Sequence, residues 1–147
     1  MNQFKINGIF LKETLIPILV YLTLSVIVLW HLLLPGYVLT LDMVFTPNIK
    51  IENFLYGFPE WGLLNKLPFL LILKVSSLLI PTWILQKIIL FSTLFLAGIS
   101  AYKLCPAKSK LGKFFAGFLY MLNPFVYVRF MVGHWLLLLA YAVTPFS

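Results

Sequence analysis

The feature that most restricts this chain is an apolar run from Leu15 to Leu34 that contains no formal charge. A helix rises about 1.5 Å per residue, so a run of this length crosses the hydrocarbon core of a bilayer. Pro17 falls in the first turn of such a helix, where its missing N–H costs little, and Pro35-Gly36 ends the helix. A cleaved signal peptide would have a shorter run and a small-residue cleavage site. The run therefore predicts a transmembrane span over 15–34.

The composition predicts that the rest of the chain also lies in lipid. Hydrophobic residues make up 62% of the 147 residues and charged residues only 10%, whereas soluble domains are about 45–50% apolar. A span takes about 20 residues, so the chain has room for about three or four spans. We therefore expect an all-α fold, a multi-pass transmembrane helical bundle.

Further apolar stretches extend this bundle. Residues 83–104 and 114–132 are long enough for a second and a third span. Residues 135–147 are too short to cross a membrane alone, and we interpret them as an incomplete fourth span of a longer protein or of a truncated reading frame. Residues 67–80 are also short, so an interfacial or re-entrant helix is favoured over a tilted span that continues past Pro81.

The placement of lysines orients the predicted spans. The chain has a formal net charge of +7, and the connection 103–113 holds four lysines and no acid. Cytoplasmic loops of membrane proteins are enriched in lysine and arginine, so we expect this connection and the N-terminus to be cytoplasmic and residues 35–81 to lie outside. The basic excess comes without an aromatic module that stacks bases. The predicted location is the cell membrane, with membrane lipid and not nucleic acid as partner.

The predicted outer loop holds most of the acidic residues. Asp42, Glu52 and Glu60 are three of the four acids in the chain. The same topology brings four more ionisable side chains to the outer face: His31, Lys87, Arg129 and His134. A carboxylate can take a proton from an attacking hydroxyl, and cations hold phosphate. This set of residues therefore suits the handling of an anionic lipid head group.

Each outer cation also has a structural interpretation. Lys87, near the start of its span, either extends its ammonium to the membrane surface or points it at a bound anion. Arg129 either does the same or binds phosphate through its planar guanidinium. His31 is either a neutral interfacial histidine beside Trp30 or a polar group that faces the loop.

The dipeptide Asn123-Pro124 interrupts the third predicted span near its middle. Proline removes one backbone hydrogen bond and disfavours helical conformation at the preceding residue. The dipeptide predicts either a kink or a broken helix whose free carbonyls line a cavity, because unpaired backbone at that depth requires protein or water as a partner.

Common enzyme motifs are absent from the sequence. It has no phosphate-binding glycine loop, no His-Glu-x-x-His and no Gly-x-Ser-x-Gly. The two histidines do not have the spacing of helical metal ligands, and Cys105 is the one cysteine. We therefore expect no metal, no cofactor and no internal disulfide.

Several short motifs in the chain resemble those of a known family. They are Pro35-Gly36, Asp42-Met43-Val44-Phe45 with Pro47, Gln86-Lys87, Leu94 to Gly98, Tyr120 to Phe125, Arg129 and Gly133-His134. Together they resemble the N-terminal region of polytopic C-type (GT-C) glycosyltransferases, especially the membrane proteins related to the arabinofuranosyltransferases and the YfhO-like proteins. Members of that family have many more spans, so the resemblance implies that this chain is the beginning of a larger fold.

The resemblance implies a sugar transfer from a polyprenyl-phosphate donor to a glycan or protein acceptor at the outer face. Asp42 matches the acidic residue of the first outer loop, which serves as general base or positions the acceptor. The implied phosphate ligands are Lys87, Arg129 and His134, and the implied supporting residues are Glu52, Glu60 and His31. Many members carry a second acid beside the first, but Asp42 stands between Leu41 and Met43. This departure favours a mechanism without metal.

Two other functions fit the same residues. A transporter or flippase of a lipid-linked or anionic substrate would use the Asn123-Pro124 break and the outer cations as its path. A small non-catalytic membrane subunit would use the lysines and aromatic residues only as anchors, and Asp42 would then tolerate replacement.

Overall fold

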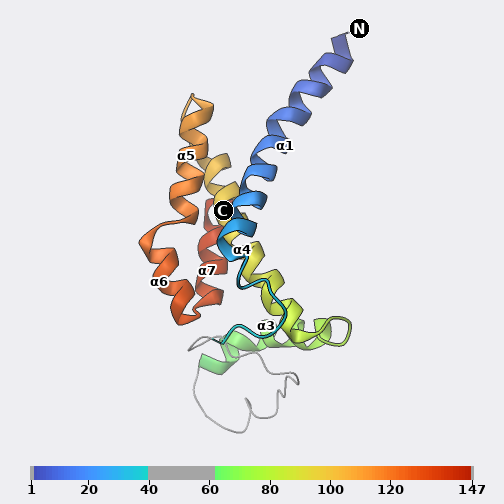
Figure 1. The fold of residues 1–147 in the computed structure, drawn as a ribbon, viewed down its shortest axis with the longest axis vertical. Helices are drawn as coiled ribbons and strands as arrows, with labels where there is room; N and C mark the ends of the chain where they lie inside the picture. Colours follow the sequence, from blue (N-terminus) through green and yellow to red (C-terminus); the bar gives the residue numbers. More distant parts are fainter. Residues whose placement is uncertain (1, 40–61, 147) are drawn as a thin grey trace.

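The computed structural model describes residues 2–39 and 62–146, with side chains for 14–39, 68–69 and 71–146. Within these residues the fold is all-helical and has no strand, which confirms the predicted all-α class (Figure 1). In chain order the elements are α1 (Asn2–Leu29), α3 (Gly62–Ser76), α4 (Thr82–Leu104), α5 (Lys110–Met121), α6 (Pro124–Val132), α7 (Trp135–Val143) and the 3-10 helix η1 (Thr144–Phe146).

Helix α4 is the central element of the bundle. Helices α1, α5 and α7 all pack against it (Figure 1). Its inward face carries Leu85, Leu90 and Leu94, each less than a tenth exposed. Burial of such leucines from several helices against one another is the main stabilising contribution in a helical core.

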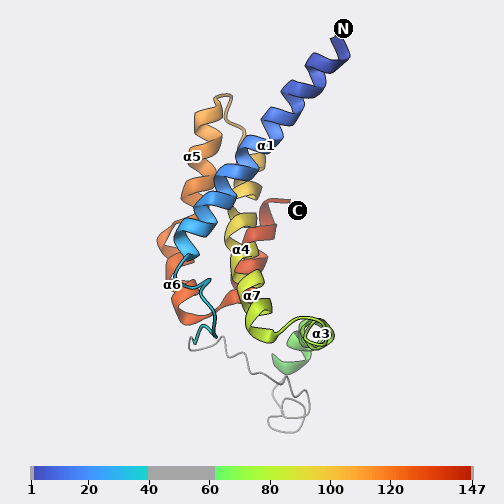
Figure 2. The same cartoon turned by 45° about the vertical axis from the view of Figure 1, so that its right-hand side comes forward.

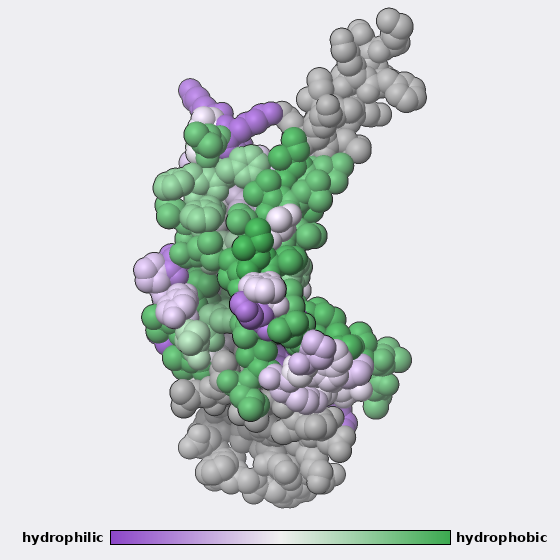
Figure 3. Space-filling view, in the orientation of Figure 1, coloured by the Kyte–Doolittle hydropathy of each residue, from purple (hydrophilic) through white to green (hydrophobic). Residues whose placement is uncertain are grey.

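Two helical stretches of the described residues are long and apolar enough to cross a membrane, Thr82–Leu104 and Lys110–Val132. In the most apolar 18 residues of each stretch, 56% of the residues are buried in the first and only 17% in the second. The second stretch therefore turns most of its side chains outward. The surface between the two ends of the bundle is correspondingly hydrophobic in Figure 3.

Helix α1 differs from the predicted span over 15–34 at both ends. It begins at Asn2 and ends at Leu29, with turns over 30–33. Pro17 therefore lies inside the helix, whereas the sequence predicted that it would fall in the first turn. Gly36 has a φ of 119°, a backbone conformation that glycine adopts without strain and that lets the chain turn away after the helix.

Tyr21 joins α1 to α4 and α5. Its ring is fully buried and lies against Gly98 of α4 and Gly117 of α5. A Cβ atom at Gly98 would lie 2.5 Å from Tyr21 Cδ1, and one at Gly117 would lie 2.6 Å from the Gly98 carbonyl oxygen. Small residues let helix backbones approach closely in this way. We call Tyr21, Gly98 and Gly117 the glycine crossing.

Asn123 divides the predicted third span into two helices. It is extended and forms the N-cap of α6, where its Oδ1 accepts from the Val126 N–H at 2.9 Å. Its Nδ2 donates to the Tyr120 carbonyl at 3.0 Å and to the Tyr141 hydroxyl at 2.8 Å. The Tyr141 hydroxyl in turn donates to the Tyr120 carbonyl at 3.0 Å. The helix is broken at the dipeptide, as in the second predicted outcome, but side chains satisfy the Tyr120 carbonyl, which is therefore not one of the free carbonyls that this outcome included.

Helix α3 lies crosswise to α4 (Figure 1 and Figure 2). It starts at Gly62 and ends at Ser76, earlier at both ends than the predicted 67–80. The Phe69 ring packs against Trp135 of α7, with ring centroids 4.4 Å apart. Since turns separate Ser76 from the start of α4, α3 and α4 are two helices and not one continuous tilted span.

The two ends of the bundle carry different residues. The connection between α4 and α5 lies at the same end as the N-terminus of α1 (Figure 1 and Figure 2). We call this the lysine end, after Lys103, Lys108, Lys110 and Lys113. The start of α4, the junction of α6 with α7 and the chain that leaves α1 lie at the opposite end, together with α3. We call this the arginine end, after Arg129.

Candidate functional site

Polar side chains in the first turns of α4 hold residues 34–38 at the arginine end. The Val38 N–H donates to Gln86 Oε1 at 2.9 Å, and Gln86 Nε2 donates to the Val38 carbonyl at 2.6 Å. The Tyr37 and Thr82 hydroxyl oxygens are 2.6 Å apart. The Gln86 amide thus pairs with both backbone groups of Val38, as a neighbouring strand would. We call this assembly the loop anchor: residues 34–38 with Thr82, Gln86 and Lys87.

Lys87 is buried in the loop anchor, with 6% of its surface exposed. Its Nζ donates to the Leu34 carbonyl and lies 5.4 Å from the centroid of the Trp83 ring. A buried ammonium is unfavourable unless it is paired, and the carbonyl and the ring supply this pairing. Of the two sequence interpretations, extension to the surface does not describe this side chain. Its binding of phosphate stays a prediction.

Arg129 and His134 meet at the junction of α6 with α7. Arg129 Nη1 lies 3.1 Å from His134 Nδ1, and the guanidinium carbon lies 5.5 Å from the centroid of the Phe125 ring. Because a guanidinium has only donors, Nδ1 is the acceptor in this contact. The His134 N–H also donates to the Arg129 carbonyl at 2.9 Å, next to Gly133 with a φ of 90°. The structure therefore brings together two of the predicted phosphate ligands.

The described side chains include no carboxylate. Among the described side chains, the guanidinium of Arg129 is held by an imidazole and an aromatic face. The side chains of all four acids lie outside the described set: Glu13, Asp42, Glu52 and Glu60. The predicted catalytic role of Asp42 and supporting roles of Glu52 and Glu60 stay predictions.

His31 lies at the arginine end in the turns that follow α1. It is exposed, and its ring centroid is 4.0 Å from that of Trp30. Both interpretations of His31, as an interfacial histidine and as a polar group that faces the loop, stay predictions. Across the described part of the chain, no group of three or more histidine, cysteine or acidic side chains is arranged to hold a metal ion.

The sequence did not predict the polar cluster that Tyr37, Thr82 and Gln86 form. A signal for part of it exists, because Thr82 and Gln86 are four residues apart and so share one face of a helix. A buried amide on the same face as a hydroxyl requires hydrogen-bond partners. The partner residues, 37 and 38, are far away in the sequence and carry no pattern that identifies them.

Comparison with known proteins yields no family model, no curated protein and no solved structure that matches this chain. The resemblance to GT-C glycosyltransferases therefore stays a prediction. Independently of that resemblance, the arginine end has a cation that is oriented by its neighbours and a chain segment that is fixed to α4. The guanidinium of Arg129 can bind an anion such as a phosphate.

Proposed function

We propose that this chain is part of a multi-pass membrane protein that transfers a sugar from a polyprenyl-phosphate donor at the outer face of the membrane. In this proposal the N-terminus and the lysine end are cytoplasmic, and the arginine end faces outward. The observation that carries the proposal is the Arg129–His134 pair, in which the imidazole and the Phe125 ring orient the guanidinium. Guanidinium binds phosphate oxygens through two parallel N–H donors.

The distribution of charge supports the proposed orientation. Four lysines lie at or beside the connection between α4 and α5, at the same end as the N-terminus of α1. The positive-inside rule places such a connection in the cytoplasm. A phosphate bound at Arg129 would then belong to a lipid of the outer leaflet.

The loop anchor supports a role for Asp42. The chain passes from Val38, which is hydrogen-bonded to Gln86, to Asp42 in four residues. An extended chain covers at most about 3.3–3.6 Å per residue, so four residues span no more than about 14 Å from Val38. We infer that the anchor keeps this carboxylate at the outer end of the bundle.

In the proposed reaction, the Asp42 carboxylate takes the proton of an acceptor hydroxyl. The hydroxyl oxygen attacks the anomeric carbon of the donor sugar, and the bond from that carbon to the phosphate oxygen breaks. Negative charge grows on the departing polyprenyl phosphate, and Arg129 offsets it. Lys87 acts as a positioning residue in this scheme, since its ammonium already holds the Leu34 carbonyl.

The test is sugar transfer by the full chain in proteoliposomes supplied with radiolabelled undecaprenyl-phosphate hexoses and pentoses. Asp42→Asn should lower the transfer rate by about 10²-fold or more, as expected for loss of a general base, with the thermal unfolding midpoint unchanged. Wild-type turnover in a folded Asp42→Asn variant would overturn the catalytic assignment. Saturable uptake of donor without transfer would favour the transporter.

The role of Arg129 has a separate test with undecaprenyl phosphate as the ligand. Arg129→Ala should weaken binding by about tenfold or more, because hydrogen bonds to a charged group contribute about 1.5–3 kcal/mol. Arg129→Lys should restore part of the affinity by keeping the charge without the bidentate geometry. Lys103→Ala is the matched control, since it removes a cation at the other end. Equal affinities in all four proteins would refute the phosphate role.

A further inference from the structure

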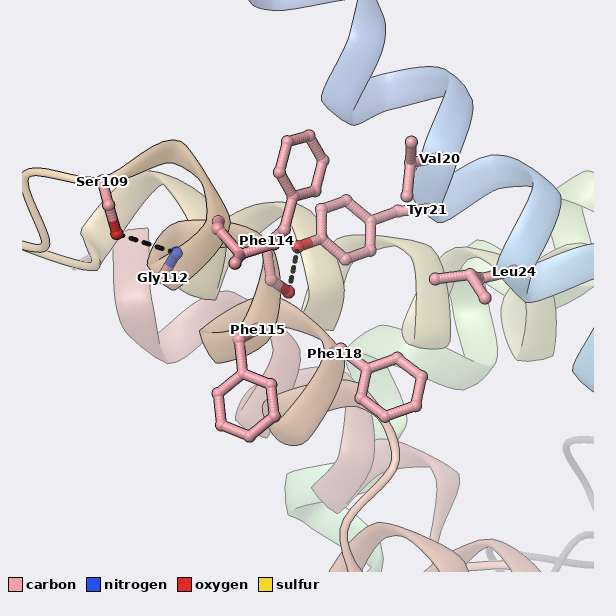
Figure 4. A pocket seen from close by; sticks show the side chains of 9 residues that line it. Val20, Tyr21, Leu24, Ser109, Gly112, Phe114, Phe115 and Phe118 are labelled. Carbon is pink, nitrogen blue, oxygen red and sulfur yellow. Dashed lines mark hydrogen bonds between the residues drawn. The ribbon is translucent and has the colours of Figure 1, made fainter.

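An open apolar groove of about 610 Å³ lies between α1 and α5 (Figure 4). Val20 and Leu24 line it from α1, and Leu111, Phe115 and Phe118 line it from α5. Its volume is within the range of about 300–1,000 Å³ that is typical of ligand pockets. None of these residues belongs to the loop anchor or to the Arg129–His134 pair, so the proposed transfer site does not account for the groove.

One end of the groove is polar and basic. Ser109 and Gly112 form part of its lining, and the Ser109 hydroxyl oxygen accepts the Gly112 N–H at 3.1 Å (Figure 4). The hydroxyl keeps its own proton for donation to a second acceptor. Lys108 and Lys110, on either side of Ser109, are exposed. Hydrophilic residues accordingly gather at this end of the bundle in Figure 3.

We propose that this groove binds an anionic phospholipid of the cytoplasmic leaflet. One acyl chain lies along Val20, Leu24 and Phe118, and the phosphate meets the Ser109 hydroxyl and the ammonium groups of Lys108 and Lys110. Basic pockets between transmembrane helices on the cytoplasmic side bind anionic head groups in this manner. The proposal depends on the membrane orientation but not on sugar transfer.

Charge complementarity selects this occupant over others. Lys108 and Lys110 flank the polar end of the groove, so a head group with a net negative charge gains attraction that a zwitterionic one lacks. A second copy of this chain would bring its own lysines to the same basic end, which is electrostatically unfavourable. The groove is also open to its surroundings, so an acyl chain can enter it from the bilayer.

The experiment measures phosphatidylglycerol and phosphatidylcholine bound to the purified full chain by native mass spectrometry. Wild type should retain phosphatidylglycerol preferentially. The double variant Lys108→Gln, Lys110→Gln should lose about tenfold or more of that preference, since each lysine near a membrane surface contributes about a factor of five. Lys66→Gln, Lys74→Gln in α3 is the control with the same change of charge. Equal preference in the two double variants would overturn the head-group contact.

A second pair of variants tests the groove itself. Val20→Trp fills the groove and should abolish the retained phosphatidylglycerol, whereas Ile27→Trp adds the same side chain at a position of α1 that is 60% exposed and outside the lining. Retention by Val20→Trp equal to that of Ile27→Trp would show that lipid binds elsewhere. If Val20→Trp instead converts a dimer to a monomer without changing lipid retention, a second copy occupies the groove and the proposal is wrong. Because Lys108 and Lys110 are exposed, their variants decide the head-group contact even if Val20→Trp fails to fold.

Discussion

The glycine crossing and the loop anchor both join α1, or the chain just after it, to α4, but different forces hold them. At the crossing, the buried Tyr21 ring lies against Gly98 and Gly117, where no Cβ atom fits. At the anchor, Gln86 pairs with both backbone groups of Val38. Close packing therefore holds α1, α4 and α5 together, whereas hydrogen bonds position residues 34–38, which lead toward the predicted site.

The two contacts have different roles: the glycine crossing stabilises the fold, and the loop anchor positions one segment. A close helix crossing in the middle of a bundle transmits any added volume to several helices at once, since interiors are closely packed. A hydrogen-bonded segment at one end can detach without disturbing that packing, although its polar groups must then find water. Substitutions at the crossing should thus affect the whole fold, and substitutions at the anchor should affect residues 34–38.

The largest effect is expected for Gly117→Ala. The new methyl group would lie 2.6 Å from the Gly98 carbonyl oxygen, a backbone atom that cannot move alone. Overpacking of this kind costs about 3 kcal/mol, whereas Gly→Ala at an exposed helical position stabilises by about 0.5–1 kcal/mol. The thermal unfolding midpoint of the purified protein in detergent measures the loss.

Leu119→Ala provides the comparison for Gly117→Ala. It changes the same helix, α5, at a side chain that is 49% exposed, and should shift the midpoint much less. A Gly117→Ala protein that unfolds at the wild-type temperature or above would mean that α4 and α5 do not approach closely at this point.

A smaller and local effect is expected for Gln86→Met. The change keeps the side-chain volume similar but leaves the N–H and the carbonyl of Val38 without their partners. The backbone groups of residues 34–38 can form hydrogen bonds with water once Gln86 is replaced. We therefore expect the free energy of unfolding to fall by about 1–2 kcal/mol, less than the full penalty for buried groups without partners. Hydrogen exchange at the Val38 amide should become about tenfold faster, while the unfolding midpoint changes less than in Gly117→Ala.

Ile88→Met is the control for Gln86→Met, two residues further along α4 at a position that is 48% exposed. It should leave exchange at Val38 unchanged. If Gln86→Met also leaves that exchange unchanged, the amide does not hold the segment, and the loop anchor provides no support for the position of Asp42.

The sequence predicted the helical class and the long apolar helix over 83–104 correctly because these depend on local properties. A run of apolar residues that holds no charge between Lys87 and Lys103 sets 83–104 apart, and the observed helix is Thr82–Leu104. The break at Asn123 was one of two predicted outcomes, because Pro124 removes a backbone donor at a known position. Which outcome occurs depends on Tyr141, whose hydroxyl reaches the break from α7, and no local pattern contains that contact.

The candidate site could be predicted only in part. Arg129 and His134 are five residues apart, and Gly133 between them favours the turn that brings them together. The partner of Lys87 could not be foreseen, because the Leu34 carbonyl belongs to a backbone position 53 residues earlier. The predicted site consisted of charged residues and histidines, whereas the uncharged Gln86 makes the two hydrogen bonds that hold Val38.

The smallest effect is expected for Tyr21→Phe. The Tyr21 hydroxyl donates to the Phe114 carbonyl at 3.1 Å, and its removal should cost only about 0.5–1 kcal/mol, the usual net contribution of one hydrogen bond. The ring, which fills the space above both glycines, remains.

Unfolding midpoints of Tyr21→Phe, Gly117→Ala and the double variant give a double-mutant cycle. The double variant should recover only part of the stability lost in Gly117→Ala. Removal of the Tyr21 hydroxyl takes away one atom that the new methyl group meets, but the Gly98 carbonyl oxygen still blocks it. A Tyr21→Phe loss as large as that of Gly117→Ala would instead mean that a hydrogen bond holds the crossing, and the distinction between the two regions would fail.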